Sequence, residues 1–301
     1  MNTLLLAAML FATPALAVPA ALITDPPANA TYPADLMPLL IASHGANLNG
    51  RIYLAEGAGP HPTMLLLHGF PGVEQSTDIA QAVRRAGWNV VLFHYRGAWG
   101  SQGDFSFGHA IEDSQVVLDW IRNPANAARY RIDPRRIVVA GHSMGGFMTV
   151  ETAIANPGLA GVILIDAWNP GADAARMAAV PAEVRDKATQ GALTAIAANL
   201  APLAGASAPA LLGELQTNAA HWNTVNDAAA LAKSPLLLFG ATGGNGDSKG
   251  IGADNIVLGD AIAAVPGARL TRYDWKSDHY FNDKRVALTA AIVEWLQKLP
   301  R

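Results

Sequence analysis

One serine lies in a sequence context that could make it a nucleophile. Ser143 is the centre of a G-x-S-x-G pattern at 141–145, which directly follows an apolar run at 137–140 and begins a helical stretch. A serine on such a tight strand-to-helix turn presents its hydroxyl clear of a sheet, and Gly141 and Gly145 let strand and helix approach closely. The N-terminus of the following helix supplies N–H groups and partial positive charge where an oxyanion would form. This pattern predicts nucleophilic catalysis at Ser143.

Short apolar runs alternate with helical stretches on both sides of this serine. The strand-like runs occupy 63–67, 88–93, 136–140, 161–165, 235–240 and 269–273. The helical stretches occupy 76–86, 109–122, 144–155, 254–264 and 283–299. Two earlier runs, 39–43 and 48–56, flank a turn at 45–47 and predict an antiparallel hairpin. The alternation predicts an α/β fold with a mostly parallel central sheet flanked by helices.

The alternation stops between residues 166 and 234. This segment is rich in alanine and other helix formers, with Pro181, Pro202 and Pro209 between them. We therefore expect a helical insertion at about 167–233. Its position indicates a cap over the carboxyl ends of the strands, where open α/β sheets bind ligands.

Further short motifs link the chain to a known family. They are HGFPG at 68–72, YRG at 95–97 with GS at 100–101, IDP at 132–134, GHSMGG at 141–146 and SDHYF at 277–281. On these motifs the chain resembles the α/β-hydrolase superfamily, and most closely its dienelactone hydrolase and prolyl oligopeptidase branches. The resemblance extends from about residue 36 to the end. It implies an α/β-hydrolase domain at 36–301 that contains the cap insertion.

The resemblance also implies roles for particular residues. Triad members in this fold follow the chain order serine, acid, histidine, with the histidine on a late loop. His279 lies between the last apolar run and the last helix, so we expect it to be the general base. The fold forms an oxyanion hole from one N–H of an early loop and one that follows the nucleophile. Those donors would be the backbone N–H groups of Phe70 and Met144, while His68 is interpreted as shaping its loop.

The acid of the triad has three candidates. The usual place is the loop after the run at 235–240, where Asp247 is the first carboxylate and our first choice. A shorter version of this loop would place its acid at the position of Gly243. Choosing Asp247 therefore assumes an insertion in the loop. Asp254 comes next in the chain but could simply cap the following helix. Asp166 ends an earlier strand, a position that some members of the fold use for the acid.

Together these residues predict a serine hydrolase that cleaves a carboxylic ester through an acyl-enzyme. The apolar cap and the lack of a charged cluster favour a small or medium uncharged acyl substrate. A serine peptidase or amidase is the nearest alternative, and a non-catalytic binding protein on the same fold is another. No cofactor or metal is expected, because the glycine-rich stretch at 243–249 has neither the register of a calcium repeat nor the spacing of a phosphate loop.

Composition excludes several other classes of function. The 301 residues are 51% hydrophobic and 15% charged, with a formal net charge of −3 and no cysteine. Disulfides, a thiolate nucleophile and cysteine-ligated zinc are therefore excluded. Without a lysine- or arginine-rich stretch, we expect no nucleic-acid partner. The sequence does not predict an oligomeric state.

The first residues resemble a targeting segment. A short apolar run at 4–12 precedes Ala15-Leu16-Ala17, a small-x-small pattern typical of signal peptidase sites. The run is too short for a stable membrane span. We therefore expect a signal peptide at 1–17, a leader at 18–35, and export to the periplasm or the medium.

Overall fold

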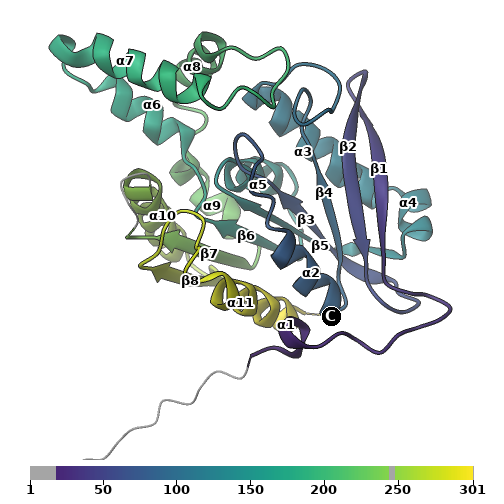
Figure 1. Cartoon of the computed structure of the whole chain (residues 1–301). Helices are drawn as coiled ribbons and strands as arrows, with labels where there is room; N and C mark the ends of the chain where they lie inside the picture. Colours follow the sequence, from purple (N-terminus) through teal and green to yellow (C-terminus); the bar gives the residue numbers. More distant parts are fainter. Residues whose placement is uncertain (1–17, 244–247, 301) are drawn as a thin grey trace, which may run out of the picture.

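An eight-stranded sheet runs through the described part of the chain, which is residues 18–243 and 248–300 in this computed structural model (Figure 1). The strands are β1 (Asp35–Ser43), β2 (Ala46–Leu54), β3 (His61–Leu67), β4 (Asn89–Phe93), β5 (Ile132–His142), β6 (Gly161–Ile165), β7 (Leu236–Ala241) and β8 (Leu270–Trp275). The predicted signal peptide at 1–17 and the candidate acid Asp247 lie outside the described residues.

The order of strands in the sheet is β1-β2-β4-β3-β5-β6-β7-β8. β1 pairs with β2, and β2 with β4, in the antiparallel sense, whereas all the later pairs are parallel. The predicted hairpin is therefore confirmed, with its turn at His44 and Gly45, which both have positive φ. The prediction of a mostly parallel sheet is confirmed as well.

Helices cover both faces of this sheet (Figure 1). They are α1 (Ala20–Ile23), α2 (Thr77–Arg85), α3 (Phe107–Arg122), α4 (Pro124–Arg129), α5 (Met144–Ala155), α10 (Ser248–Ala263) and α11 (Arg285–Lys298). α2 and α11 pack on one face, where Ile79 and Leu288 join one core cluster. α3, α5 and α10 pack on the other, where Leu118, Phe147 and Leu258 join a second. β4, β6 and β7 are buried throughout, as expected for parallel strands covered on both faces.

The segment expected to be a leader, residues 18–35, contains a short helix, α1. In α1, Ala21 is buried and belongs to the same core cluster as α2 and α11. The Arg85 Nε donates to the Ala21 carbonyl at 2.5 Å. These contacts connect the segment to the domain.

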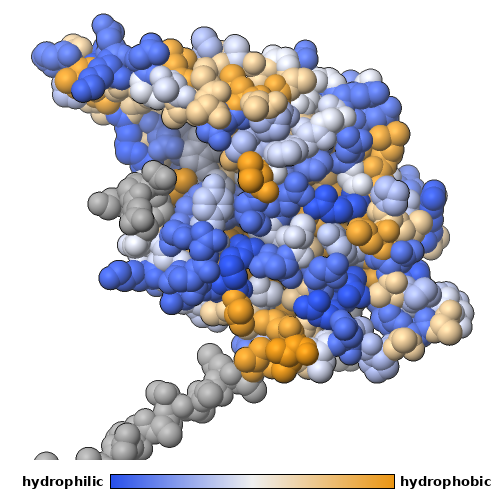
Figure 2. All heavy atoms as spheres, in the orientation of Figure 1, coloured by the Kyte–Doolittle hydropathy of each residue, from blue (hydrophilic) through white to orange (hydrophobic). Residues whose placement is uncertain are grey.

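The predicted cap insertion is present between β6 and β7. It comprises α6 (Pro170–Ala178), α7 (Ala182–Ala197), α8 (Ala208–Thr217), the 3-10 helix η1 (Thr224–Asp227) and α9 (Ala228–Leu231). α6, α7 and α8 lie together at one end of the molecule (Figure 1), where hydrophilic and hydrophobic residues are mixed on the surface (Figure 2). α7 has no buried residue, so it is the least firmly packed of these helices. Across residues 18–243 and 248–300, no helix combines the length and apolar character needed to cross a membrane.

Candidate active site

Ser143 occupies a sharp turn between β5 and α5. Its backbone is held at φ 58° and ψ −122°, a strained conformation for a residue with a side chain. The glycines two residues before and after Ser143 stand where the structure has no room for a side chain. A Cβ on Gly141 would lie 2.0 Å from the carbonyl oxygen of Gly145, and a Cβ on Gly145 would lie 2.0 Å from that of Leu67. The turn can therefore form only where residues 141 and 145 both lack a side chain.

Backbone hydrogen bonds fix this turn against the neighbouring strand. The Ser143 N–H donates to the Ile165 carbonyl at 3.1 Å, and the Trp168 N–H donates to the Ser143 carbonyl at 2.9 Å. Ser143 remains half-buried rather than enclosed. Its hydroxyl is thus held in one place yet stays accessible.

His279 is oriented by a buried carboxylate. It follows β8, and its Nδ1 lies 2.6 Å from Oδ2 of Asp166, which follows β6. Asp166 has no exposed surface. Its other oxygen, Oδ1, accepts the Ala241 N–H at 2.9 Å. Burial raises the pKa of Asp166 above its ordinary value, while the hydrogen bond to His279 acts in the opposite direction. With Nδ1–H donated to the carboxylate, the Nε2 of His279 is left free to accept a proton.

A second histidine holds the loop that carries His279. The His142 Nε2–H donates to the His279 carbonyl at 2.8 Å, and the two rings lie 4.6 Å apart. Burial lowers the pKa of His142 to about 3, so its ring is neutral and adds no charge beside the base. The residue before the nucleophile therefore also positions the general-base candidate.

The structure distinguishes the candidate acids that it describes. Asp166 contacts His279, whereas Asp254 lies in α10 and accepts two hydrogen bonds of 2.8 Å from Arg176 of the cap. Asp247, the first choice from the sequence, is outside the described residues. Among the described candidates, Asp166 is thus the one brought to the histidine.

The two predicted oxyanion donors are in segments next to Ser143, the loop at Gly69 and the first residue of α5. Neither the Phe70 nor the Met144 backbone N–H has an acceptor among the described residues. A Cβ built on Gly69 would lie 3.0 Å from the Cβ of Ser143, so the loop before Phe70 passes directly against the nucleophile. Two unpaired N–H groups beside a nucleophile are what an oxyanion hole requires.

His68 fixes the direction of one of these donors. Its Nδ1–H donates to the Gly69 carbonyl at 2.8 Å, and its Nε2 lies 3.3 Å from the Nδ1 of His94. Burial lowers the pKa of His68 to about 3 and that of His94 to about 4, so both rings are neutral. The C=O and N–H of a trans peptide point in opposite directions. The Gly69 carbonyl and the Phe70 N–H belong to the same peptide. Because the carbonyl is held toward His68, the Phe70 N–H points away from His68.

A row of aromatic rings packs next to the loop of Phe70. Phe70 and Phe107 have ring centroids 5.9 Å apart, and Phe107 and Trp168 have theirs 5.2 Å apart. The ring neighbours of His279, in contrast, are His142 and Tyr280. Because Phe107 is buried in the core, this row of rings belongs to the packing that supports the loop of Phe70.

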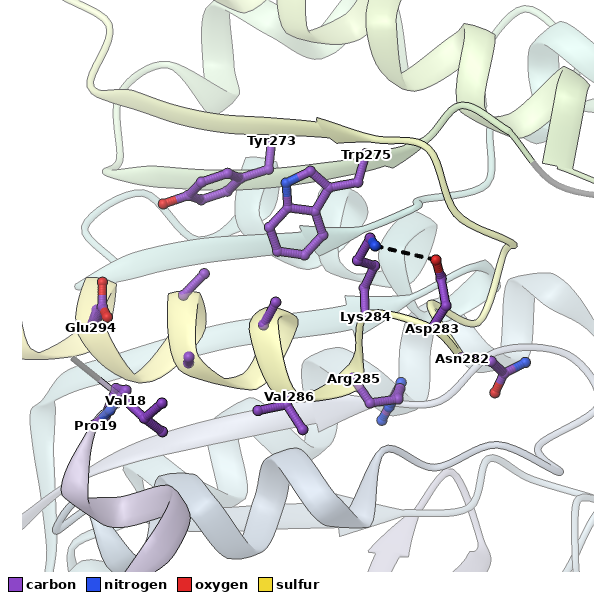
Figure 3. A pocket seen from close by; sticks show the side chains of 13 residues that line it. Val18, Pro19, Tyr273, Trp275, Asn282, Asp283, Lys284, Arg285, Val286 and Glu294 are labelled. Atoms are coloured by element: carbon purple, nitrogen blue, oxygen red, sulfur yellow. Dashed lines mark ion pairs between the residues drawn. The ribbon is translucent and has the colours of Figure 1, made fainter. Parts of the chain in front are cut away.

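One pocket of the surface does not include these residues. A pocket of about 600 Å³ lies between α11, β8 and the first described residues, with Tyr273 and Trp275 on one wall (Figure 3). None of the predicted site residues lines it. In the described ranges, no group of three or more histidine or acidic side chains is placed to hold a metal ion.

Comparisons with known proteins agree with this fold. An uncharacterized protein of Mycobacterium tuberculosis is 27% identical over 133 residues, which are 44% of this chain and 46% of that protein. The chain thus aligns with under half the length of this relative. The esterase of Pyrobaculum calidifontis is 17% identical, with a TM-score of 0.61 over 89% of this chain and 87% of its own. An esterase of Pyrococcus furiosus is 14% identical, with a TM-score of 0.63 over 91% and 97%.

The match to a family confirms the resemblance predicted from the motifs. The model of the alpha/beta hydrolase family matches residues 64–295, which include the loop of Phe70, the turn of Ser143 and the loop of His279. This match covers most of the chain, and the sheet order and helical cap agree with it. The chain therefore belongs to the alpha/beta hydrolase family.

Proposed function

We propose that this protein is a serine-dependent hydrolase of carboxylic esters, with Ser143, His279 and Asp166 as its catalytic triad. The observation that carries the proposal is the 2.6 Å hydrogen bond between buried Asp166 and His279. It occurs in a chain that also holds a serine on a strained strand-to-helix turn. These are the three groups that acyl transfer by a serine needs.

Each of these residues has one role in the proposed reaction. His279 takes the proton of the Ser143 hydroxyl at its Nε2 as the oxygen attacks the ester carbonyl. The N–H groups of Phe70 and Met144 donate to the oxyanion that forms, and Asp166 stabilises the imidazolium. The imidazolium then gives its proton to the departing alcohol, which leaves an acyl-enzyme. Water repeats the attack with His279 as base, which releases the acid and restores Ser143.

An ester series tests the proposal. The wild-type protein should hydrolyse p-nitrophenyl esters from acetate to octanoate, and a fluorophosphonate probe should label Ser143, as mapped by mass spectrometry. Ser143→Ala should lose both the turnover and the label while keeping the wild-type thermal unfolding curve. Turnover of aminoacyl amides without turnover of esters would instead indicate a peptidase or amidase. The absence of any labelling would indicate a non-catalytic binding protein.

We also propose that the chain is exported. The support is the apolar run at 4–12 and the small residues Ala15 and Ala17 of the expected cleavage site. Expression of the full sequence in a bacterial host, followed by N-terminal sequencing of the exported product, should give Val18 as the first residue. A product in the cell extract that retains Met1 would contradict export.

A further inference from the structure

One indole outside the triad holds the loop that carries Phe70. Trp99 lies in the segment between β4 and α3, and its Nε1–H donates to the Pro71 carbonyl at 2.8 Å. Pro71 has no N–H, so its carbonyl is the backbone group by which a hydrogen bond can fix it. The Gly69 carbonyl on the other side of Phe70 accepts from His68. The loop is therefore held by a side chain both before and after the predicted oxyanion donor.

The two side chains that hold this loop lie close to each other. A Cβ built on Gly72 would lie 2.7 Å from the Trp99 Nε1 and 2.8 Å from the His68 Cε1. The ring of His94 has its centroid 6.2 Å from that of Trp99, and its Nδ1 lies 3.3 Å from the Nε2 of His68. Trp99 and His68 thus act on the same few residues of the loop.

The backbone of Trp99 is strained. Its φ is 49°, a region that residues with a side chain rarely adopt, and Gly97 and Gly100 near it also have positive φ. Such strain persists only where the surrounding structure imposes it. The indole is 42% exposed, so burial in the core does not account for it. The hydrogen bond to Pro71 is the contact that this conformation provides.

The cap imposes the conformation of Trp99. The cap segment at 202–204, between α7 and α8, runs along the loop of Trp99. The Trp99 N–H donates to the Pro202 carbonyl at 2.9 Å, and the Ala204 N–H donates to the Gly97 carbonyl at 2.7 Å. The residues between them complete an antiparallel bridge. A continuous chain of contacts thus leads from the cap through Trp99 to the loop of Phe70.

We propose that Trp99 is a positioning residue that couples the cap to the oxyanion hole. The cap segment at 202–204 sets the backbone of Trp99, and the indole holds the Pro71 carbonyl, which keeps the Phe70 N–H directed at the oxyanion. The hole is then fully formed only while this cap segment is paired with the loop of Trp99. The proposal rests on the hydrolase activity proposed above and adds a positioning residue to it.

Removing the indole donor tests the first half of the coupling. Trp99→Phe keeps an aromatic ring and loses the Nε1–H. A typical hydrogen bond contributes a factor of about five to an equilibrium, so kcat for p-nitrophenyl acetate should fall about fivefold while KM stays near its wild-type value. An alkyl trifluoromethyl ketone forms an adduct with Ser143 that places an oxyanion in the hole. Its affinity should fall by the same factor, because the hole acts on the transition state and on this adduct but not on the bound substrate.

Trp120→Phe is the matched control. Trp120 lies in α3, where its ring packs 5.3 Å from that of Tyr130. The substitution makes the same chemical change away from the loop of Phe70. Both kcat and the affinity for the trifluoromethyl ketone should stay at their wild-type values.

A variant of the cap tests the second half. Ala204→Pro removes the N–H that donates to the Gly97 carbonyl, and Ala204 is exposed, so no core packing is lost. This variant should also lower kcat about fivefold. The double variant Trp99→Phe/Ala204→Pro should be no slower than either single variant, because both substitutions break the same linkage.

The outcomes separate this inference from the proposed function. Wild-type kcat and ketone affinity in Trp99→Phe, even with a lowered Tm, would overturn the positioning role. Losses that multiply in the double variant would overturn the coupling to the cap. Ser143-dependent turnover by the wild-type protein would survive each of those results. Loss of ester turnover and of fluorophosphonate labelling in the wild-type protein would overturn the proposed function itself.

Discussion

Replacing Asp166 by asparagine removes the carboxylate that faces His279 and keeps nearly the same shape. The surroundings determine how the new amide must lie. Oδ1 of Asp166 accepts the Ala241 N–H at 2.9 Å and is 3.4 Å from the Asn255 amide nitrogen, so both neighbours there are donors. The asparagine oxygen must take that position, which turns its NH₂ group toward His279. A donor facing Nδ1 forces the ring proton onto Nε2, the atom that should accept the proton of Ser143.

The size of the effect follows from two losses. The histidine is held in the wrong tautomer, and its cation has no carboxylate beside it. In a serine triad this change lowers kcat by about 10⁴-fold, which is about 5 kcal/mol in the barrier. The fold should survive, because burial raises the pKa of Asp166 and its ionised form at neutral pH therefore opposes folding. We expect kcat/KM for p-nitrophenyl butanoate and the rate of fluorophosphonate labelling to fall together, with an unchanged or higher Tm.

The other two carboxylates serve as controls. Asp254→Asn weakens the ion pair with Arg176 and should change kcat/KM by no more than about threefold, as a partly exposed pair contributes little. Asp247→Asn should behave in the same way. A large loss in Asp247→Asn together with near-normal activity in Asp166→Asn would refute the reasoning and return the acid to the loop after β7.

Three further changes test neighbouring parts of the structure. Gly145→Ala places a Cβ 2.0 Å from a β3 carbonyl oxygen and should destabilise the protein by about 3 kcal/mol or more, measured by urea unfolding. His68→Ala removes the donor to the Gly69 carbonyl, which no longer holds the direction of the Phe70 N–H, and should lower kcat by about 10²-fold with little change in KM. His68→Asn restores a donor and should recover part of that loss. Burial, with Asp227 nearby, raises the pKa of Glu151 from 4.5 to about 7. Between pH 4.5 and about 7 the Glu151 carboxyl keeps its proton in the folded state but has lost it in the unfolded chain. The wild-type protein should therefore lose stability relative to Glu151→Gln as the pH rises through this range. An equal pH dependence of the two urea midpoints would contradict this.

The parts of the fold that could be predicted are those with local signals. The turn at Ser143 is marked by glycines at positions where the structure has no room for a Cβ. β6 is apolar throughout, and β5 has an apolar run at 137–140 just before the turn. The cap is predicted because the alternation of strands and helices stops in that segment. This signal indicates that helices are present, but not how they pack on one another. Nothing in the composition of α7 reveals that it has no buried residue, because burial depends on the helices that face it.

The choice of Asp166 as the proposed acid depends on a contact that no local sequence pattern indicates. An aspartate after an apolar strand has the same sequence context whether it caps a turn or orients a histidine. What distinguishes Asp166 is that β6 and β8 lie on the two sides of β7, so that the loop carrying His279 must reach back across one strand to meet it. The backbone at Asp166 contributes by adopting a positive φ of 42°, and the Ala241 N–H at the end of β7 holds the carboxylate from the other side. The contact between Asp166 and His279 thus depends on the order of three strands, and Asp166 could be proposed as the acid only once that order was known.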